Sequence, residues 1–285
     1  MRTSFVTSKD GTEIGYRQIG QGPGLIIVHG TMESSLSHSQ LAEALSDNFT
    51  VYLYDRRGRG LSGPYSQNHM IQKEVEDLEA LLSKTGAHFV FGVSVGALIC
   101  LEAALELASI HKAALFDPPL IIDGSVSSDF MVRYDKEIAD GDLVSALVTA
   151  MLGGQMGPPF FKYVPHWILK TLTKMVIKID EKNVKKGDVT MKLLAPTIHY
   201  DFNLSFELEE KHERFSVIDA EVLLLGASKS PAYFKTALDA LTRILPHAER
   251  IDFPKLNHGA SGNKNRGGDP ERVAQELLKF FKPTM

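Results

Sequence analysis

The strongest structural signal in this chain is the stretch Phe89-Val90-Phe91-Gly92-Val93-Ser94-Val95-Gly96-Ala97. It begins as a short apolar strand, passes through a serine flanked by glycines, and continues into an apolar helix. The pattern G-x-S-x-G between a strand and a helix is typical of a nucleophile elbow. The glycines let backbone segments approach closely in a sharp turn, and the helix N-terminus supplies N–H groups where an oxyanion would form. We therefore interpret Ser94 as a nucleophile.

A plainer interpretation of the same stretch is a glycine-rich turn whose serine does no chemistry. The motif by itself is common, so its surroundings have to decide between the two interpretations. An apolar strand before Ser94 and an apolar helix after it are the context that an elbow requires. They favour the catalytic interpretation.

The composition is that of an ordinary globular protein of 285 residues, 44% hydrophobic and 23% charged. The net charge of −4 and the absence of a basic run argue against nucleic acid as a partner. Cys100 is the only cysteine, which excludes an intramolecular disulfide. No apolar run is long enough for a transmembrane helix or a signal peptide, so we expect a cytoplasmic protein without a membrane partner. The oligomeric state cannot be read from these data.

Strands and helices alternate on both sides of the elbow. Asp10-Gly11 predicts a hairpin within residues 3–19, and apolar runs predict strands at 25–28, 51–54 and 113–116. Helices are predicted at 39–45, 74–84 and 97–107. The pattern resumes near the C-terminus with strands at 221–226 and 249–253 and helices at 232–245 and 270–281. Such alternation predicts an α/β fold with a mostly parallel sheet flanked by helices.

Residues 120–216 interrupt this alternation. The segment lacks strand periodicity, is rich in methionine, and is broken by Gly153-Gly154 and Gly157-Pro158-Pro159. Its main helices are predicted at 160–179 and 191–210. We interpret the segment as a helical insertion between two strands of the sheet.

Four motifs together make the chain resemble an alpha/beta hydrolase with a helical cap. They are His29-Gly30, the basic loop at 55–62, the elbow at Ser94, and Asn257-His258-Gly259. The resemblance implies a core domain of residues 1–119 and 217–285 and a cap (lid) of residues 120–216. It also implies a serine hydrolase that uses no metal or organic cofactor.

The same resemblance assigns roles to single residues. His258, in the loop after the last strand, is the expected base, and His29 is a structural residue of the oxyanion loop. The usual acid position after Leu225 holds no carboxylate. Asp117, which ends the strand before the cap, is therefore the expected acid, with Asp201 or no acid at all as alternatives.

The oxyanion hole is expected to consist of backbone N–H groups. Val95, directly after the nucleophile, supplies one, and Thr31 or Met32 supplies the other. The three arginines of the basic loop, Arg56, Arg57 and Arg59, are interpreted as structural partners of local acids rather than as a phosphate site.

We expect a small or medium apolar substrate under the cap, with Met131, Met151, Met156 and Trp167 as candidate pocket residues. Lys229 is a weaker candidate for polarising the substrate. The leading function is cleavage of an ester, thioester or related acyl bond through an acyl-enzyme on Ser94. C–C bond cleavage or a lyase reaction on the same fold, and a non-catalytic ligand receptor, remain open.

Overall fold

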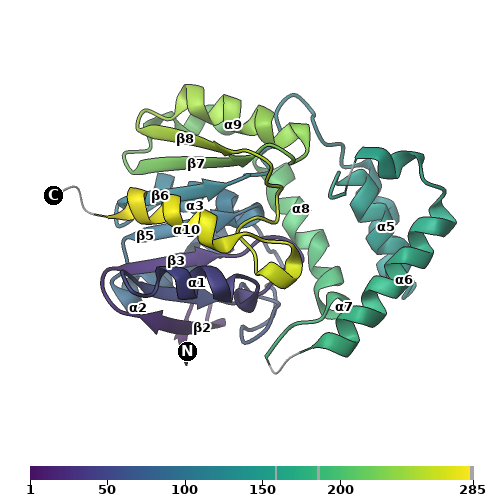
Figure 1. Cartoon of the computed structure of the whole chain (residues 1–285), viewed down its shortest axis with the longest axis horizontal. Helices are drawn as coiled ribbons and strands as arrows, with labels where there is room; N and C mark the ends of the chain where they lie inside the picture. Colours follow the sequence, from purple (N-terminus) through teal and green to yellow (C-terminus); the bar gives the residue numbers. More distant parts are fainter. Residues whose placement is uncertain (158, 185–186, 283–285) are drawn as a thin grey trace.

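An eight-stranded sheet forms the centre of the molecule in the computed structural model, which describes residues 1–157, 159–184 and 187–282 (Figure 1). The strand order is β1-β2-β4-β3-β5-β6-β7-β8. The strands are β1 (Arg2–Thr7), β2 (Glu13–Gly20), β3 (Gly24–Val28), β4 (Thr50–Tyr54), β5 (Phe89–Val93), β6 (Lys112–Phe116), β7 (Glu221–Ala227) and β8 (Ala248–Phe253).

The strand directions confirm the predicted mostly parallel sheet. β1 pairs with β2 and β2 with β4 in antiparallel fashion, whereas every pair from β4 to β8 is parallel. The β1–β2 hairpin turns at Gly11, whose φ of 88° suits a residue without a Cβ. Because the parallel strands all point the same way, the loops that follow β3, β5, β6, β7 and β8 meet at one edge of the sheet.

Helices cover both faces of the sheet. α1 (Ser39–Leu45) and α10 (Pro270–Phe281) pack on one face, and α2 (Ile71–Thr85), α3 (Val95–Glu106) and α9 (Ala232–Ile244) pack on the other. The sequence of β3 is continuously apolar because both of its faces are buried. Its residues Ile26 and Val28 pack in the core under α2 and α3, and Leu25 and Ile27 pack in the core under α1 and α10. Each fully buried side chain of this kind contributes about 1.5–3 kcal/mol.

The segment between β6 and β7, here called the cap segment (residues 120–216), is helical in its described part. Its helices are α4 (Asp129–Ala139), α5 (Leu143–Gly153), α6 (His166–Asn183), α7 (Met191–Leu194) and α8 (Ile198–Glu207). The two predicted helices need correction. The first begins at His166 instead of 160, because Pro165 stands at its N-cap, and the second is divided by a 3-10 turn at Pro196. α4 and α5 were not predicted as separate helices.

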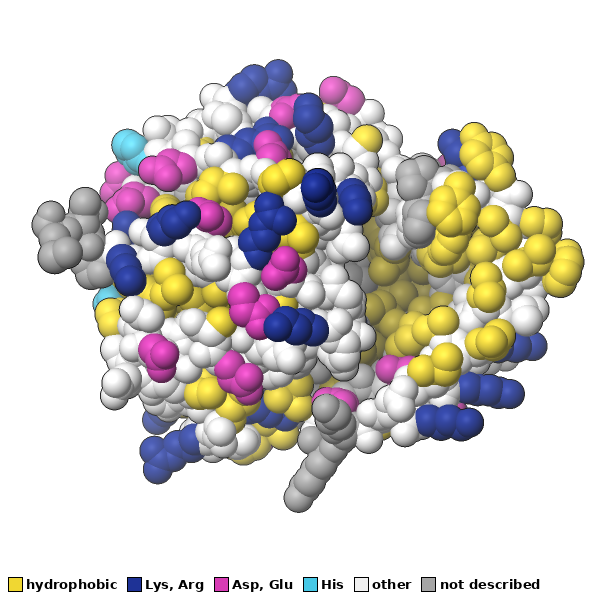
Figure 2. Space-filling view, viewed as in Figure 1, with side chains coloured by type: hydrophobic (Ala, Val, Ile, Leu, Met, Phe, Trp, Pro, Cys, Tyr) yellow, Lys and Arg dark blue, Asp and Glu magenta, His cyan; other side chains and the backbone are white. Residues whose placement is uncertain are grey.

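Figure 2 shows a hollow between the sheet-bearing core and the helices α5 and α6, with hydrophobic side chains along it. α8 lies against the core at the base of the cap segment, where Leu204 and Leu208 belong to the same hydrophobic cluster as α2 and α3. No helix among the described residues combines the length and the apolar character needed to cross a bilayer.

Candidate active site

Ser94 occupies a sharp turn between β5 and α3. Its backbone has φ 54° and ψ −130°. This conformation is strained for an L-residue, and strained residues of this kind cluster at functional sites. The turn is held by the Ser94 N–H, which donates to Phe116 O at 2.9 Å. The side chain lies at the end of the sheet where the carboxyl ends of the parallel strands meet, and the residue is 8% exposed.

The two glycines of the elbow are required by close backbone contacts. A Cβ on Gly92 would lie 2.3 Å from Gly96 O, and a Cβ on Gly96 would lie 2.2 Å from Val28 O. Neither contact is possible for a real side chain. The motif therefore reflects the packing of α3 against β3 and β5, as the sequence interpretation requires.

Asp117 and His258 meet beside Ser94. Asp117 Oδ2 lies 3.1 Å from His258 Nδ1, within the 2.6–3.2 Å range expected for an acid that orients a base. Asp117 is 1% exposed and stands at φ 44° directly after β6, with its N–H donating to Leu225 O at 2.8 Å. This contact leaves His258 Nε2 for the pocket. The described side chains of Ser94 and His258 form no hydrogen bond with each other, and catalytic hydrogen bonds are often long before a substrate binds.

Two further residues that the sequence analysis missed hold the acid and the base. The Ser230 hydroxyl donates to Asp117 Oδ2 at 2.5 Å, and the Phe234 ring stacks on the His258 ring with centroids 4.3 Å apart. Both follow β7, in the loop and helix where the usual carboxylate is absent. Their position after the carboxyl end of a parallel strand is the signal that could have identified them.

The oxyanion loop after β3 is fixed by buried hydrogen bonds. His29 accepts at Nε2 from Arg56 N–H at 3.1 Å and approaches Gly30 O with Nδ1 at 3.0 Å, so Nδ1 carries its proton. Burial, followed by the charges of Arg59 and Arg56, lowers the pKa of His29 to about 3. His29 is thus neutral and fully buried, which agrees with a structural role.

The expected oxyanion donors lie around the nucleophile. Val95 is the first residue of α3, where a helix leaves its N–H groups unpaired. Thr31 lines the cavity at Ser94, and Met32 follows it at φ 58°. Within the described part of the chain, the N–H groups of Thr31 and Met32 have no hydrogen-bond partner. All three N–H groups are consequently available to a ligand.

The basic loop after β4 is a network of buried ion pairs. Arg57 pairs with Asp77 and Asp10, and Arg56 pairs with Glu74. These contacts agree with the structural interpretation of the loop. Burial acts to raise the pKa of Glu74, but the charge of Arg56, the nearby His69 ring and the hydrogen bonds from Arg56 hold it well below its ordinary value.

Asp201, the alternative acid, belongs to this network instead of contacting His258. Its Oδ1 accepts from Arg56 Nη1 at 2.9 Å and its Oδ2 from Arg59 Nη2 at 2.6 Å. Both carboxylate oxygens are therefore engaged by arginines. The structure brings Asp117, not Asp201, to the candidate base.

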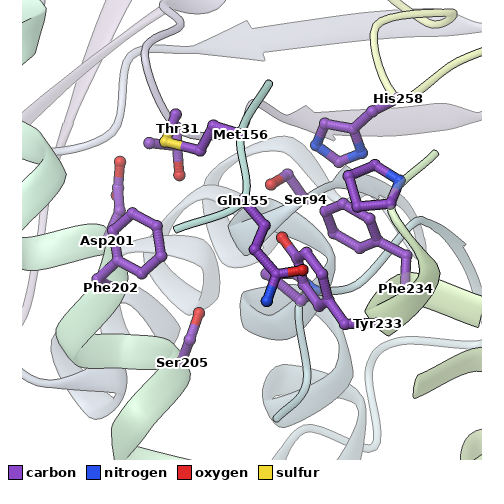
Figure 3. A pocket seen from close by; sticks show the side chains of 12 residues that line it. Thr31, Ser94, Gln155, Met156, Asp201, Phe202, Ser205, Tyr233, Phe234 and His258 are labelled. Carbon is purple, nitrogen blue, oxygen red and sulfur yellow. The ribbon is translucent and has the colours of Figure 1, made fainter. Parts of the chain in front are cut away.

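A cavity of about 120 Å³ opens at Ser94 between the core and the cap segment (Figure 3). Ser94 and His258 lie on one side of it, and Asp201 and Phe202 of α8 lie across from them. Burial and the charge of Asp117 raise the pKa of Tyr233, so that its hydroxyl stays protonated. The wall consists of Thr31, Ser94, Pro119, Gln155, Met156, Asp201, Phe202, Ser205, Pro231, Tyr233, Phe234 and His258.

Of the four pocket residues proposed from the sequence, Met156 lines this cavity and the structure places the other three elsewhere. Met131 is buried in the hydrophobic cluster of the cap segment itself, and Met151 is half-buried beside Gly157. Trp167, at the start of α6, is 70% exposed. Lys229 is also exposed and is not part of the cavity wall.

A metal site is not evident in the described ranges, since nowhere in them do three His, Cys, Asp or Glu side chains converge as a metal ion would need.

The fold and the arrangement around Ser94 define a hydrolase of the alpha/beta type. The chain belongs to the family described as serine aminopeptidase S33, whose sequence model matches residues 23–262.

Individual relatives span nearly the whole chain. A non-heme chloroperoxidase of Streptomyces lividans is 31% identical over 97% of this chain and 99% of its own length. A bifunctional esterase/perhydrolase of Acinetobacter calcoaceticus is 23% identical over 98% of this chain and 99% of its own length. An alpha/beta hydrolase structure from Sphaerobacter thermophilus superposes with a TM-score of 0.79 at 30% identity, covering 98% of this chain and all of that one.

Proposed function

We propose that this protein hydrolyses carboxylic esters of small acyl groups through an acyl-enzyme on Ser94. The observation that carries the proposal is the 3.1 Å contact between Asp117 Oδ2 and Nδ1 of His258, which lines the cavity together with Ser94. A buried carboxylate at Nδ1 fixes the tautomer that leaves Nε2 free to accept a proton. This is the arrangement that a serine nucleophile needs.

The reaction follows from these positions. Ser94 Oγ attacks the ester carbonyl carbon while its proton passes to His258 Nε2. The oxyanion receives hydrogen bonds from the N–H of Val95 and from Thr31 or Met32. Collapse of the tetrahedral intermediate breaks the bond to the alcohol, which takes the proton from His258. Water then attacks the acyl-enzyme, giving a proton to His258, and the carboxylic acid leaves as the proton returns to Ser94.

The size of the cavity points to short acyl groups. Its volume is about 120 Å³. A closed cavity of about 150 Å³ suffices for benzene, so the space beside Ser94 suits an acyl chain of a few carbons. Apolar side chains such as Met156 and Phe202 favour an apolar acyl chain over a charged one.

The test compares p-nitrophenyl esters from acetate to decanoate, together with a fluorophosphonate probe that forms a bond to an activated serine. We expect one equivalent of probe on Ser94 and the highest kcat/KM with the shortest acyl groups. The Ser94→Ala variant is the matched control. Labelling of Ser94 without ester turnover would favour C–C cleavage or a lyase reaction. A protein that neither reacts with the probe nor turns over esters would be a receptor.

Perhydrolysis is a second candidate, favoured by the name of one relative that matches along nearly the whole chain, the bifunctional esterase/perhydrolase. Hydrogen peroxide in place of water would attack the same acyl-enzyme, giving a peroxycarboxylic acid and free Ser94. Adding hydrogen peroxide to the acetate ester assay and measuring peracetic acid tests it. Release of acetate alone, at the rate seen without peroxide, would exclude it.

A further inference from the structure

Asp201 connects the cap segment to the oxyanion loop through one arginine. It lies on α8, is 1% exposed, and its Oδ2 accepts from Arg59 Nη2 at 2.6 Å. The other terminal nitrogen of the same guanidinium, Nη1, donates to Gly30 O at 3.2 Å. The planar guanidinium thus spans the distance between a cap carboxylate and a core peptide group.

The Gly30 carbonyl belongs to the peptide group that carries the Thr31 N–H. Because a trans peptide is planar, its N–H points opposite to its C=O. Arg59 and His29 both hold the carbonyl on the buried side of the loop. The Thr31 N–H is thereby directed away from them, and Thr31 and Asp201 both line the cavity (Figure 3).

Arg59 depends on Asp201 for its counter-ion, whereas its neighbour Arg56 has a second carboxylate partner. Arg56 also forms two hydrogen bonds with Glu74, at 3.1 and 2.6 Å. Among the described residues, Asp201 is the one carboxylate paired with Arg59, whose Nε has no partner. Without Asp201, the Arg59 charge would be buried with no counter-ion, which a protein tolerates poorly.

We infer that Asp201 is a positioning residue that couples the packing of the cap segment on the core to the orientation of the Thr31 N–H in the oxyanion hole. The inference rests on the proposed function. Asp201 holds Arg59 in place, Arg59 holds the Gly30 carbonyl, and the Thr31 N–H is aimed at the oxyanion. The cap segment therefore contributes to the chemical step itself, in addition to shaping the cavity.

The experiment compares Asp201→Asn with Asp77→Asn in the full-length chain. Asp77 accepts from Arg57 Nε at 2.7 Å in a buried pair of the same loop, but Arg57 does not reach Gly30. Asp201→Asn loses two buried ion pairs, with Arg56 and Arg59, and Asp77→Asn loses one, with Arg57, so we expect Tm to fall in both variants and further in Asp201→Asn. Removing an oxyanion donor lowers kcat by about 10²–10³. A donor that is present but misdirected should cost less, so we expect kcat to fall by about 10–100-fold in Asp201→Asn and not in Asp77→Asn.

Two readouts separate positioning from general destabilisation. KM should change by less than about threefold, because the lost interaction is made only in the transition state. The affinity for a short-chain trifluoromethyl ketone, whose adduct with Ser94 places an oxyanion in the hole, should fall by the same factor as kcat/KM. Arg59→Lys, which keeps one charge but cannot bridge two acceptors in the same way, should reproduce both effects even if Asp201→Asn does not fold.

The outcomes distinguish this inference from the proposed function. If the wild type hydrolyses esters in a Ser94-dependent way but Asp201→Asn and Asp77→Asn lose equal kcat, the inference is wrong. The same holds if Arg59→Lys binds the ketone as tightly as the wild type. If the wild type itself shows no Ser94-dependent turnover, the proposed function fails first.

Discussion

The substitution Asp117→Asn tests the central contact of the site. In the structure, Asp117 Oδ2 faces two groups, His258 Nδ1 and the Ser230 hydroxyl, whereas the buried Oδ1 has no partner in the described part of the chain. An asparagine has one oxygen and one NH₂ group for these two positions. If the NH₂ took the Oδ1 position, two N–H donors would be buried unpaired. If it faced His258, only one acceptor would be unpaired.

The second orientation therefore costs less, since each buried unsatisfied group costs about 1–3 kcal/mol. With NH₂ facing it, His258 Nδ1 becomes an acceptor and the ring proton moves to Nε2, which then cannot accept the proton of Ser94. An error of tautomer of this kind lowers kcat by about 10⁴, equivalent to about 5.5 kcal/mol. We expect a loss of about 10³–10⁴ in kcat on p-nitrophenyl acetate, with KM nearly unchanged.

Ser230→Ala provides the matched control, because it removes one hydrogen bond to the same oxygen but keeps the charge and the tautomer. Its kcat should fall by less than about tenfold, in line with about 1 kcal/mol for one hydrogen bond. Thermal unfolding of both variants shows whether the fold is intact. An Asp117→Asn variant that stays folded and keeps more than about 10% of wild-type kcat would refute the assignment of Asp117 as the orienting acid.

Three further predictions address the nucleophile, a buried histidine and the cavity. Ser94→Ala should lose nearly all ester turnover while keeping its Tm within a few degrees, and more than about 10% residual activity would rule out Ser94 as the nucleophile. His29 has a pKa of about 3 when folded and 6.5 ordinarily, so its contribution to stability is present above pH 6.5 and is lost as the pH falls toward 3. When the pH is lowered from 6 to 5, the free energy of unfolding measured with urea should therefore fall by about 1 kcal/mol more in the wild type than in His29→Gln. If the free energies of unfolding of the two proteins changed with pH in parallel, the buried neutral state of His29 would be contradicted. Phe202→Ala should shift the preferred p-nitrophenyl ester toward longer acyl chains, because the ring closes one side of the cavity; an unchanged chain-length profile would show that this wall does not limit the substrate.

Much of the core fold could be predicted because its signals are local. The apolar run at 25–28 is continuous since β3 is buried on both faces, and the glycines around Ser94 are needed by contacts within a few residues or with the adjacent strand. The cap segment was predicted less well. Prolines at 165 and 196 moved or divided its helices, and helical periodicity alone does not say which side of a helix faces the cavity.

The pocket residues show the same limit. Met131, Met156 and Trp167 are chemically suited to an apolar pocket, yet one is buried in the cap segment, one lines the cavity and one faces solvent. Their side-chain directions depend on how α4, α5 and α6 pack, which is a matter of long-range contacts. No short stretch of sequence contains that information.

The sequence by itself determined the elbow at Ser94 and the parallel sheet around it, because strand ends and glycine turns are encoded by neighbouring residues. The candidate acid and base came from the family resemblance, which left the acid open between Asp117, Asp201 and none. Only the tertiary structure decided which carboxylate meets His258. Asp117 and His258 are 141 positions apart and meet because β6 and the loop after β8 end at the same edge of the sheet. Asp201 instead pairs with Arg56 and Arg59, more than 140 positions away, because a buried carboxylate needs cations or hydrogen-bond donors to offset its lost hydration.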